Sequence, residues 1–390
     1  MRLQDVPIAE EAEERSWQVV REAFEARIPN PRQRIRPSLP AAIVAAGVAL
    51  AITAVAVSAS GGSVLNTVRD ALGVRNAATA LVRLPAAGRL LVNSSDGPWI
   101  VNVDGSRRYL GYLGGYGYGQ AGWSPHGLYE VVVLHLRELA AIDPKGNLRW
   151  SLARGLVSDP RWSDDGYRIA YRSGSSLRVV AGDGTGDHLI ATNTATAAAA
   201  WDGPTHQLAY ADQRGRIHLV NADTGKTLWT SKPGPVPTAV AWEPSQRQII
   251  ALSARTVRVL HANDGKLFKE IPIGSGRHVL AVSPDGPVAV TTLSASGQSS
   301  IVLLHPAHPW LSPRPVFHGS GEFNSLVWSP NGQWLLASWA SADQWVFIKL
   351  DIKSGAVERV QAVSSIAREF NSDGPPSIGG WCCTPGIPPT

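Results

Sequence analysis

Few residues of this 390-residue chain have side chains and spacing that could do chemistry. Cys382 and Cys383 are the two cysteines, and they are adjacent. A vicinal pair can close a disulfide ring, cross-link two chains or stay as thiols. We expect a structural disulfide that holds a C-terminal tail, folded back from Ser364, near Trp381.

Metal-binding patterns in the sequence are weak. His305, His308 and His318 form one histidine cluster, in a stretch whose prolines favour a stiff surface loop. The segment 183–187, Asp-Gly-Thr-Gly-Asp, offers few oxygens for Ca²⁺, which takes six to eight, so a hairpin turn is favoured. Nucleophile-elbow, phosphate-loop and zinc-protease motifs are absent from the sequence. We therefore expect no metal, no cofactor, no catalytic residue and a protein that is not an enzyme.

One repeated unit organises most of the chain. It is Trp-Ser-Pro-x-Gly followed by an apolar run, and its clearest copy starts at Trp328. The residue before each turn recurs at steps of 39, 39, 39, 41, 40 and 46 residues, at Leu84, Trp123, Trp162, Trp201, Trp242, Val282 and Trp328. A second turn rich in Asp and Gly keeps a similar period. About 40 residues is the length of one four-stranded propeller blade, so the array predicts a β-propeller.

The expected fold is all-β, a seven-bladed β-propeller of four-stranded blades over residues 77–365. We expect the five tryptophan anchors of the repeat to fill the space between neighbouring blades, because their large apolar area suits that role: Trp123, Trp162, Trp201, Trp242 and Trp328. The sequence leaves two modes of ring closure. A strand at 77–84 could pair with the last blade, or residues 365–374 could be recruited, in which case an eighth partial blade is possible. Residues 366–390 are expected to be a C-terminal tail with the vicinal cysteines.

A membrane helix is expected ahead of the propeller. Residues 38–60 are uncharged and rich in Ala, Val, Ile and Leu, long enough to cross about 30 Å of hydrocarbon. Arg32, Arg34 and Arg36 precede the segment, which predicts a cytoplasmic N-terminus and an extracytoplasmic propeller. Residues 61–76 form the expected linker. A cleaved signal peptide or a buried helix are the alternatives for the apolar segment.

The N-terminal tail, residues 1–37, contains a predicted amphipathic helix. Trp17, Val20 and Phe24 recur at helical spacing before Pro29 ends the pattern. The stripe is typical of a solvated juxtamembrane helix, and docking to a cytoplasmic partner or to the membrane surface is the alternative.

The turn motif carries a family resemblance. Trp-Ser-Pro-x-Gly with its apolar strand resembles the TolB-type, WD40-like (PD40) propeller repeat over about residues 80–365, and Ala222 to Trp229 is similar to quinoprotein-like repeats. The Gly-His and Trp-Asp pairs of true WD40 repeats are missing. The layout of tail, span and propeller resembles uncharacterised single-pass membrane proteins of high-GC actinobacteria. This resemblance implies architecture and little about activity.

These observations predict a membrane-anchored, extracytoplasmic binding or scaffold module for an envelope protein, a peptide or a glycan. The net charge of +5 is spread without a basic stripe, so a nucleic-acid partner is not expected. Two alternatives remain: a transmembrane sensor whose N-terminal helix binds a regulator, as in anti-sigma factors, and a quinone-dependent dehydrogenase with a vicinal cysteine ring.

Overall fold

The computed structural model describes residues 83–110, 118–203, 205–243, 245, 247–284, 286–294, 296–304, 313–351 and 354–383. They all belong to the second of two compact units, Leu65–Thr390. The predicted tail helix, membrane segment and linker lie outside the described residues, as do His305 and His308. No helix in the described part of the chain is long and apolar enough to cross a membrane.

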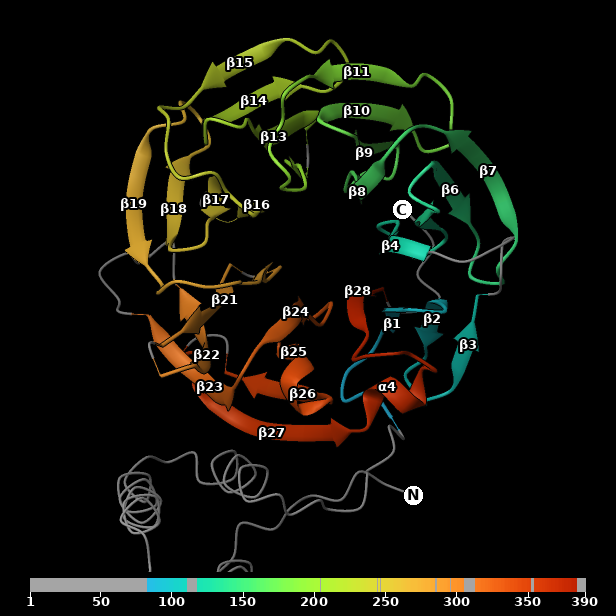
Figure 1. Cartoon of the computed structure of the whole chain (residues 1–390), viewed down its shortest axis with the longest axis vertical. Coiled ribbons are helices and arrows are strands. Elements are labelled where there is room, and N and C mark those ends of the chain that lie inside the picture. The colour runs from blue at the N-terminus through green and yellow to red at the C-terminus, as the bar shows by residue number, and fades with distance from the viewer. Residues whose placement is uncertain are drawn as a thin grey trace, which may run out of the picture. The chain divides into compact units, whose positions relative to one another are not determined.

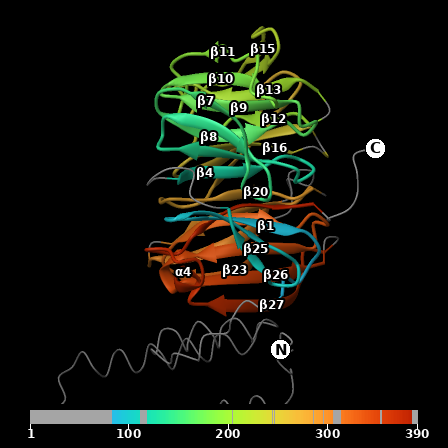
Figure 2. The ribbon, with the colours of Figure 1, turned by 90° about the vertical axis from the view of Figure 1, so that its right-hand side faces the viewer.

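The described residues form seven four-stranded antiparallel sheets arranged around a ring (Figure 1). Viewed from the side, the sheets lie next to one another like blades, and their strands run between the two faces of the ring (Figure 2). The predicted all-β fold, the seven blades and the four strands per blade are confirmed. Within each blade the first strand is innermost and the fourth forms the outer rim (Figure 1).

The first four blades have the following strands, given from the inner to the outer edge. The first blade is β28 (Ser377–Cys382), β1 (Arg89–Ser94), β2 (Gly97–Val101) and β3 (Arg107–Tyr109). The second is β4 (Tyr118–Trp123), β5 (Glu130–Leu134), β6 (Glu138–Ile142) and β7 (Leu148–Ala153). The third is β8 (Val157–Trp162), β9 (Arg168–Ser173), β10 (Ser176–Ala181) and β11 (His188–Ala191). The fourth is β12 (Ala200–Trp201), β13 (Gln207–Ala211), β14 (Ile217–Asn221) and β15 (Thr227–Thr230).

The last three blades complete the ring. The fifth is β16 (Ala239–Glu243), β17 (Gln248–Leu252), β18 (Thr256–His261) and β19 (Leu267–Pro272). The sixth is β20 (Leu280–Val282), β21 (Val288–Leu293), β22 (Gln298–Leu304) and β23 (Arg314–Ser320). The seventh is β24 (Phe323–Trp328), β25 (Trp334–Trp339), β26 (Gln344–Leu350) and β27 (Val357–Ser364), with the 3₁₀ turn η1 (Ala340–Ala342) after β25. The short helix α4 (Ile366–Glu369) follows β27.

The repeated turn forms each inner hairpin through local hydrogen bonds. In the seventh blade the Ser329 hydroxyl accepts a bond of 3.0 Å from the Trp334 amide, and the Gly332 amide donates to the Ser329 carbonyl at 2.9 Å. Gly332 has φ of +66°, which glycine adopts without steric cost. The turn therefore needs both its Ser and its Gly, and it brings the tryptophan anchor next to the strand that follows.

Ring closure differs from our expectation. Strand β28 pairs antiparallel with β1, with Leu90 opposite Trp381, so a C-terminal strand completes the first blade. The predicted boundaries of 77–365 for the propeller and 366–390 for the tail are therefore wrong at residues 377–382. Because β28 and β1 are separated by nearly 300 residues, their pairing in one sheet holds the ring closed through backbone hydrogen bonds, which is the physical advantage of this closure.

Residues 365–374 do not begin an eighth blade. Phe370 is fully buried and packs against the rings of Trp345 and Trp99, with centroids 5.1 and 5.8 Å apart. Arg107 of β3 donates to the Glu369 carbonyl at 3.0 Å. The segment therefore covers the junction of the last and first blades, and Phe370 packs into that junction.

Candidate functional site

The loops that join the first to the second strand and the third to the fourth strand of each blade lie on one face of the ring, because neighbouring strands are antiparallel. We call this the turn face. The tryptophan anchors end at this face, and three polar features lie on it: a charged network between the third and fourth blades, a cavity between the seventh and first blades, and a buried cluster between the first and second.

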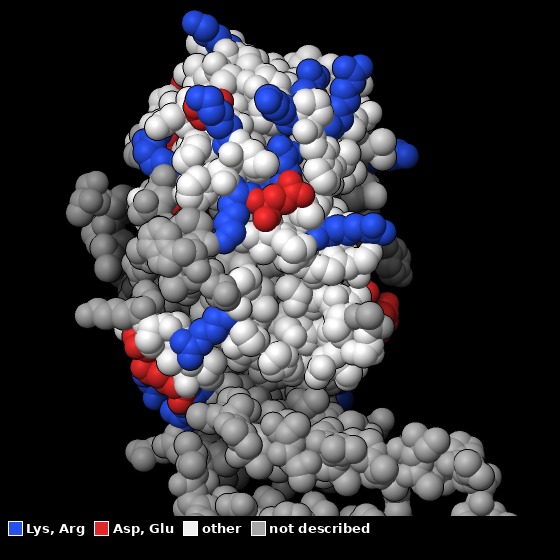
Figure 3. All heavy atoms as spheres, turned by 90° about the vertical axis from the view of Figure 1, so that its left-hand side faces the viewer, with Lys and Arg blue, Asp and Glu red and all other residues white. Residues whose placement is uncertain are grey.

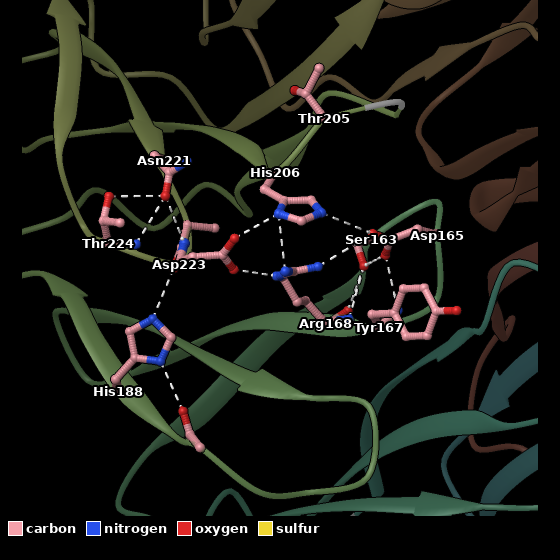
Figure 4. A network of polar contacts seen from close by, with 12 residues as sticks. Ser163, Asp165, Tyr167, Arg168, His188, Thr205, His206, Asn221, Asp223 and Thr224 are labelled. Carbon is pink, nitrogen blue, oxygen red and sulfur yellow. Dashed lines mark hydrogen bonds and ion pairs between the residues drawn. The ribbon is translucent and has the colours of Figure 1, made fainter.

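The charged network joins three turns (Figure 4). The Arg168 guanidinium donates to Asp223 at 2.5 Å and to Asp165 at 3.3 Å, and the His206 ring contacts Asp223 at 2.6 Å. Burial alone would raise the pKa of Asp223, but the hydrogen bonds from Arg168 and His206 outweigh it and lower that pKa. Arg168 comes from the third blade and His206 and Asp223 from the fourth, so the network holds the two blades together.

A cavity of about 450 Å³ opens at the turn face between the seventh and first blades. Pro85 and Ala86 form one wall, and the opposite wall carries two amides and three charged groups: Asn331, Gln333, Lys349, Glu358 and Arg359. The Lys349 ammonium pairs with Glu358 at 2.7 Å, and both side chains are more than one third exposed. A volume of this size lies within the range of small-ligand sites, and its lining suits a polar ligand with carboxylate or hydroxyl groups.

The buried cluster lies between the first and second blades, and Glu130 is its central residue. The position paired with the anchor is apolar and fully buried in the six other blades: Leu90, Ile169, Leu208, Ile249, Val288 and Leu335. In the second blade this position is Glu130, which is equally buried. A carboxyl group therefore replaces an aliphatic side chain at this one junction.

The Glu130 carboxyl group has an unusual electrostatic environment. Neither of its oxygens has a hydrogen-bond partner within the described part of the chain. Burial raises the pKa of Glu130 to about 8, against a smaller opposing effect of Arg89, and the charge of Asp143 adds to the rise. Glu130 is therefore mostly protonated at neutral pH, since charging it would leave an anion without hydrogen bonds.

Arg89, at the start of β1, is the cation of the buried cluster. Its guanidinium carbon lies 4.9 Å from the centroid of the Trp123 ring, and its Nη2 donates to the Gly127 carbonyl at 2.7 Å. Burial lowers the pKa of Arg89, while Glu130 raises it. Arginine keeps its charge in proteins despite such shifts, so the first blade places a fixed positive charge on the anchor of the second.

Cys382 and Cys383 are joined in a vicinal disulfide at the end of β28, in the same cluster. The Cys383 Sγ lies 2.8 Å from the Pro125 carbonyl oxygen, and the Cys382 Sγ lies 3.5 Å from it. A Cβ atom at Gly127 would lie 2.7 Å from Arg89 Nη2 and 3.4 and 3.5 Å from the sulfurs of Cys383 and Cys382. Gly127, with φ of +61°, therefore leaves the space in which these three groups meet.

The structure brings together two sets of residues that the sequence suggested separately. Trp123 and the cysteine pair meet at this junction, although 258 residues separate Pro125 from Cys383. Trp162, Trp201, Trp242 and Trp328 are buried at other blade junctions. The indole nitrogens of Trp201 and Trp328 donate to carbonyl oxygens of the preceding blade, at 3.0 and 3.2 Å. Trp17, Val20 and Phe24 lie outside the described residues.

Arg89 and Glu130 were missed from the sequence, and Trp381 was placed in the tail without being recognised as an anchor. Trp381 is the anchor of the first blade, because it is buried, pairs with Leu90 and donates to the Ala87 carbonyl at 3.2 Å. Its signal was present, since Trp-Cys-Cys-Thr-Pro resembles an anchor followed by its proline turn. Glu130 was also detectable, as the one charged residue at a position that is otherwise apolar in every copy.

The remaining candidate ligands are used inside the protein. Asp187 accepts hydrogen bonds from Arg178, Arg154 and Tyr171, and Asp183 accepts from the Thr185 amide and hydroxyl within its hairpin turn. His318 contacts the Ser300 hydroxyl at 2.8 Å. In the described ranges no three His, Cys, Asp or Glu side chains are grouped as metal ligands.

Basic residues outnumber acidic ones in the fourth and fifth blades. Residues 201–280 contain ten Lys and Arg against six Asp and Glu. The space-filling view of this side of the ring shows blue side chains spread over the rim, with fewer red ones (Figure 3). On this side of the ring the blue side chains are separated by white ones and form no continuous stripe (Figure 3).

The fold and the junction define the class of protein: a seven-bladed β-propeller closed by its C-terminal strand. No family model matches the chain, and no curated protein sequence is similar to it.

Among solved structures, the chain is similar to a protein of the mitotic checkpoint complex, at 17% identity and a TM-score of 0.52, over 62% of this chain and 76% of that one. It is similar to Hsv2 of Kluyveromyces lactis, at 16% identity and a TM-score of 0.51, over 70% of this chain and 95% of that one. It is also similar to a Bacteroides uniformis protein described as a 6-phosphogluconolactonase, at 15% identity and a TM-score of 0.53, over 71% of this chain and 99% of that one. These WD40 and lactonase-type propellers share the fold, and the finer TolB-type assignment stays a prediction.

Proposed function

We propose that this protein is a non-catalytic binding module that presents the turn face of its propeller to an envelope protein, a peptide or a glycan. The cavity between the seventh and first blades carries the proposal. It combines a suitable volume with a lysine, an arginine, a glutamate and two amides, which together can hydrogen-bond a polar chain. Propellers commonly bind partners through such loop faces.

The similar structures are consistent with this proposal. One of them is part of an assembly, the mitotic checkpoint complex. The predicted membrane segment at residues 38–60 would place the propeller outside the cytoplasm, so the proposed partner is extracytoplasmic. The partner's chemistry follows from the cavity, where exposed cations and amides favour ligands with carboxylate, phosphate or hydroxyl groups.

Proximity labelling in intact cells tests the proposal. With the label on Thr390, we expect envelope or secreted proteins to be recovered; with the label on Met1, we expect membrane background. Recovery of a cytoplasmic regulator by the Met1 label would instead favour the sensor alternative, and cytoplasmic prey at Thr390 would overturn the predicted topology.

A matched pair of variants tests the cavity itself. Lys349→Ala removes a cavity cation paired with Glu358 at 2.7 Å, and Lys266→Ala removes a cation paired with Asp264 at 2.7 Å on the fifth blade. We expect Lys349→Ala to lose most of the prey captured by the wild-type chain and Lys266→Ala to keep it. Equal capture by both variants would show that binding takes place away from the cavity.

A further inference from the structure

The vicinal disulfide lies at the end of β28, on the turn face. Cys382 is the last residue of that strand and Cys383 follows it, and both residues are partly exposed. A structural disulfide is usually protected by burial, whereas an accessible one beside a cation is open to exchange. The surroundings of the two sulfurs therefore decide between a structural and a reactive role.

Arg89 is the cation beside the two sulfurs. Its Nη2 and both sulfur atoms border the position that a Cβ of residue 127 would take, at 2.7, 3.4 and 3.5 Å. Each sulfur therefore lies within about 6 Å of that nitrogen, close enough for the charge to favour a thiolate by about 3-fold or more. Arg89 is held in place by its bond to the Gly127 carbonyl and by the Trp123 ring.

The reduced form of the pair also has partners in the structure. The carbonyl oxygen of Pro125 lies 2.8 Å from the Cys383 sulfur, and that of Ser124 lies 3.6 Å from the Cys382 sulfur. Each oxygen can accept a weak hydrogen bond from a thiol. These oxygens would therefore stabilise the dithiol form, and the pairing of β28 with β1, which continues to Ser377, holds the strand that carries the cysteines.

We propose that Cys382–Cys383 is a site of reversible thiol–disulfide exchange with dithiols, either small molecules or the dithiol of a reductase, and that Arg89 is a positioning residue for the leaving sulfur. This activity is separate from the proposed binding function and does not depend on it.

The exchange has two balanced steps. One thiolate of the incoming dithiol attacks a protein sulfur, the S–S bond breaks, and its electron pair leaves on the other protein sulfur as a thiolate beside Arg89. The second thiolate of the dithiol then attacks the other sulfur of the dithiol, which is bonded to the protein in the mixed disulfide. This closes the disulfide of the oxidised dithiol and releases the first protein sulfur as a thiolate. The dithiol is oxidised to a disulfide, the protein gains two electrons, and the two protons of the dithiol end on Cys382 and Cys383.

The experiment measures reduction of the full chain by dithiothreitol at pH 7, with protein thiols counted by alkylation and mass spectrometry. The wild-type chain, purified without reductant, should show no free thiol at first and two after reduction, and removal of dithiothreitol followed by an excess of oxidised glutathione should return it to none. Arg89→Gln should slow reduction about 3- to 10-fold, and Arg89→Lys should restore most of the rate. High salt should slow the wild-type reaction by a similar factor.

Arg168→Gln is the matched control, because Arg168 begins β9 as Arg89 begins β1, but it contacts Asp223 instead of cysteine. This variant should be reduced at the wild-type rate. Two free thiols in protein purified in air would overturn the proposal, as would equal rates for Arg89→Gln and Arg168→Gln. If Arg89→Gln does not fold, the salt dependence and Arg89→Lys decide, and a wild-type rate independent of salt would contradict a role for the charge.

Discussion

Glu130→Leu is the substitution whose effect follows most directly from the structure. Leucine or another aliphatic residue stands at the equivalent position of the six other blades, and each of these side chains is fully buried. Leucine should therefore fit the junction between the first and second blades, and the substitution removes a buried carboxyl group that has no hydrogen-bond partner within the described residues. We expect a more stable protein.

The size of the effect depends on pH in a defined direction. The pKa of Glu130 is about 8 in the folded protein, against 4.5 for an ordinary glutamate. Because the folded state holds the proton on Glu130 more tightly, the contribution of Glu130 to stability is greatest below pH 4.5, falls as pH rises and becomes constant above pH 8. The whole loss is about 5 kcal/mol, since each unit of pKa corresponds to about 1.4 kcal/mol.

Denaturant unfolding of the wild-type chain and of Glu130→Leu at a series of pH values between 4 and 9 measures this difference. The gain in unfolding free energy from the substitution should be small near pH 4 and should grow by about 5 kcal/mol towards pH 9. Glu270→Leu, on the exposed strand β19, should change the unfolding free energy by less than about 0.5 kcal/mol at every pH. Parallel pH curves for wild type and Glu130→Leu would refute the reasoning.

Two further substitutions test the closing strand and the charged interior. Trp381→Ala should cost about 3–5 kcal/mol in denaturant unfolding, as for the equally buried anchor Trp328, because the closing strand is part of the core; a cost below 1 kcal/mol would contradict that role. Asp187→Asn should cost about 2–3 kcal/mol at pH 7, since Asp187 is nearly buried and bonded to Arg178, Tyr171 and Arg154, whereas the exposed control Asp264→Asn should leave the unfolding free energy unchanged. Burial raises the pKa of Asp187, but hydrogen bonds, mainly those of Arg178, outweigh it and hold that pKa below its usual range. The difference in unfolding free energy between wild type and Asp187→Asn should therefore disappear as pH falls through the pKa of Asp187 in the folded protein.

Much of the fold could be predicted because the repeat is written in local chemistry. A Ser hydroxyl, a Pro and a Gly with positive φ act within five residues, so Ser329 and Gly332 mark their turn in the sequence itself. The large apolar surface of an anchor such as Trp328 adds a second local signal. The number and spacing of the blades follow from counting these signals.

The candidate site was less predictable, because its residues come from segments far apart in the chain. Arg89 lies in β1, Glu130 in β5 and the cysteines at the end of β28, and nothing in their local sequences indicates that they share a junction. The cysteines lie beyond the last copy of the repeat in the sequence, which is why the sequence predicts a tail there. The strand that follows Trp381 in space is β1, nearly 300 residues earlier in the chain.

The sequence by itself therefore determined the all-β class, the seven blades, the turn chemistry and most of the anchors, since each depends on contacts between residues close in the chain. Only the tertiary structure decided how the ring closes. It also decided which charged groups meet at the junction of the first and second blades. The physical reason is that β-strand pairing is not limited by sequence distance, so the partner of a terminal strand is set by the closed geometry of the whole ring. That geometry places the disulfide, Arg89 and Glu130 around Trp123 at the junction of the first and second blades.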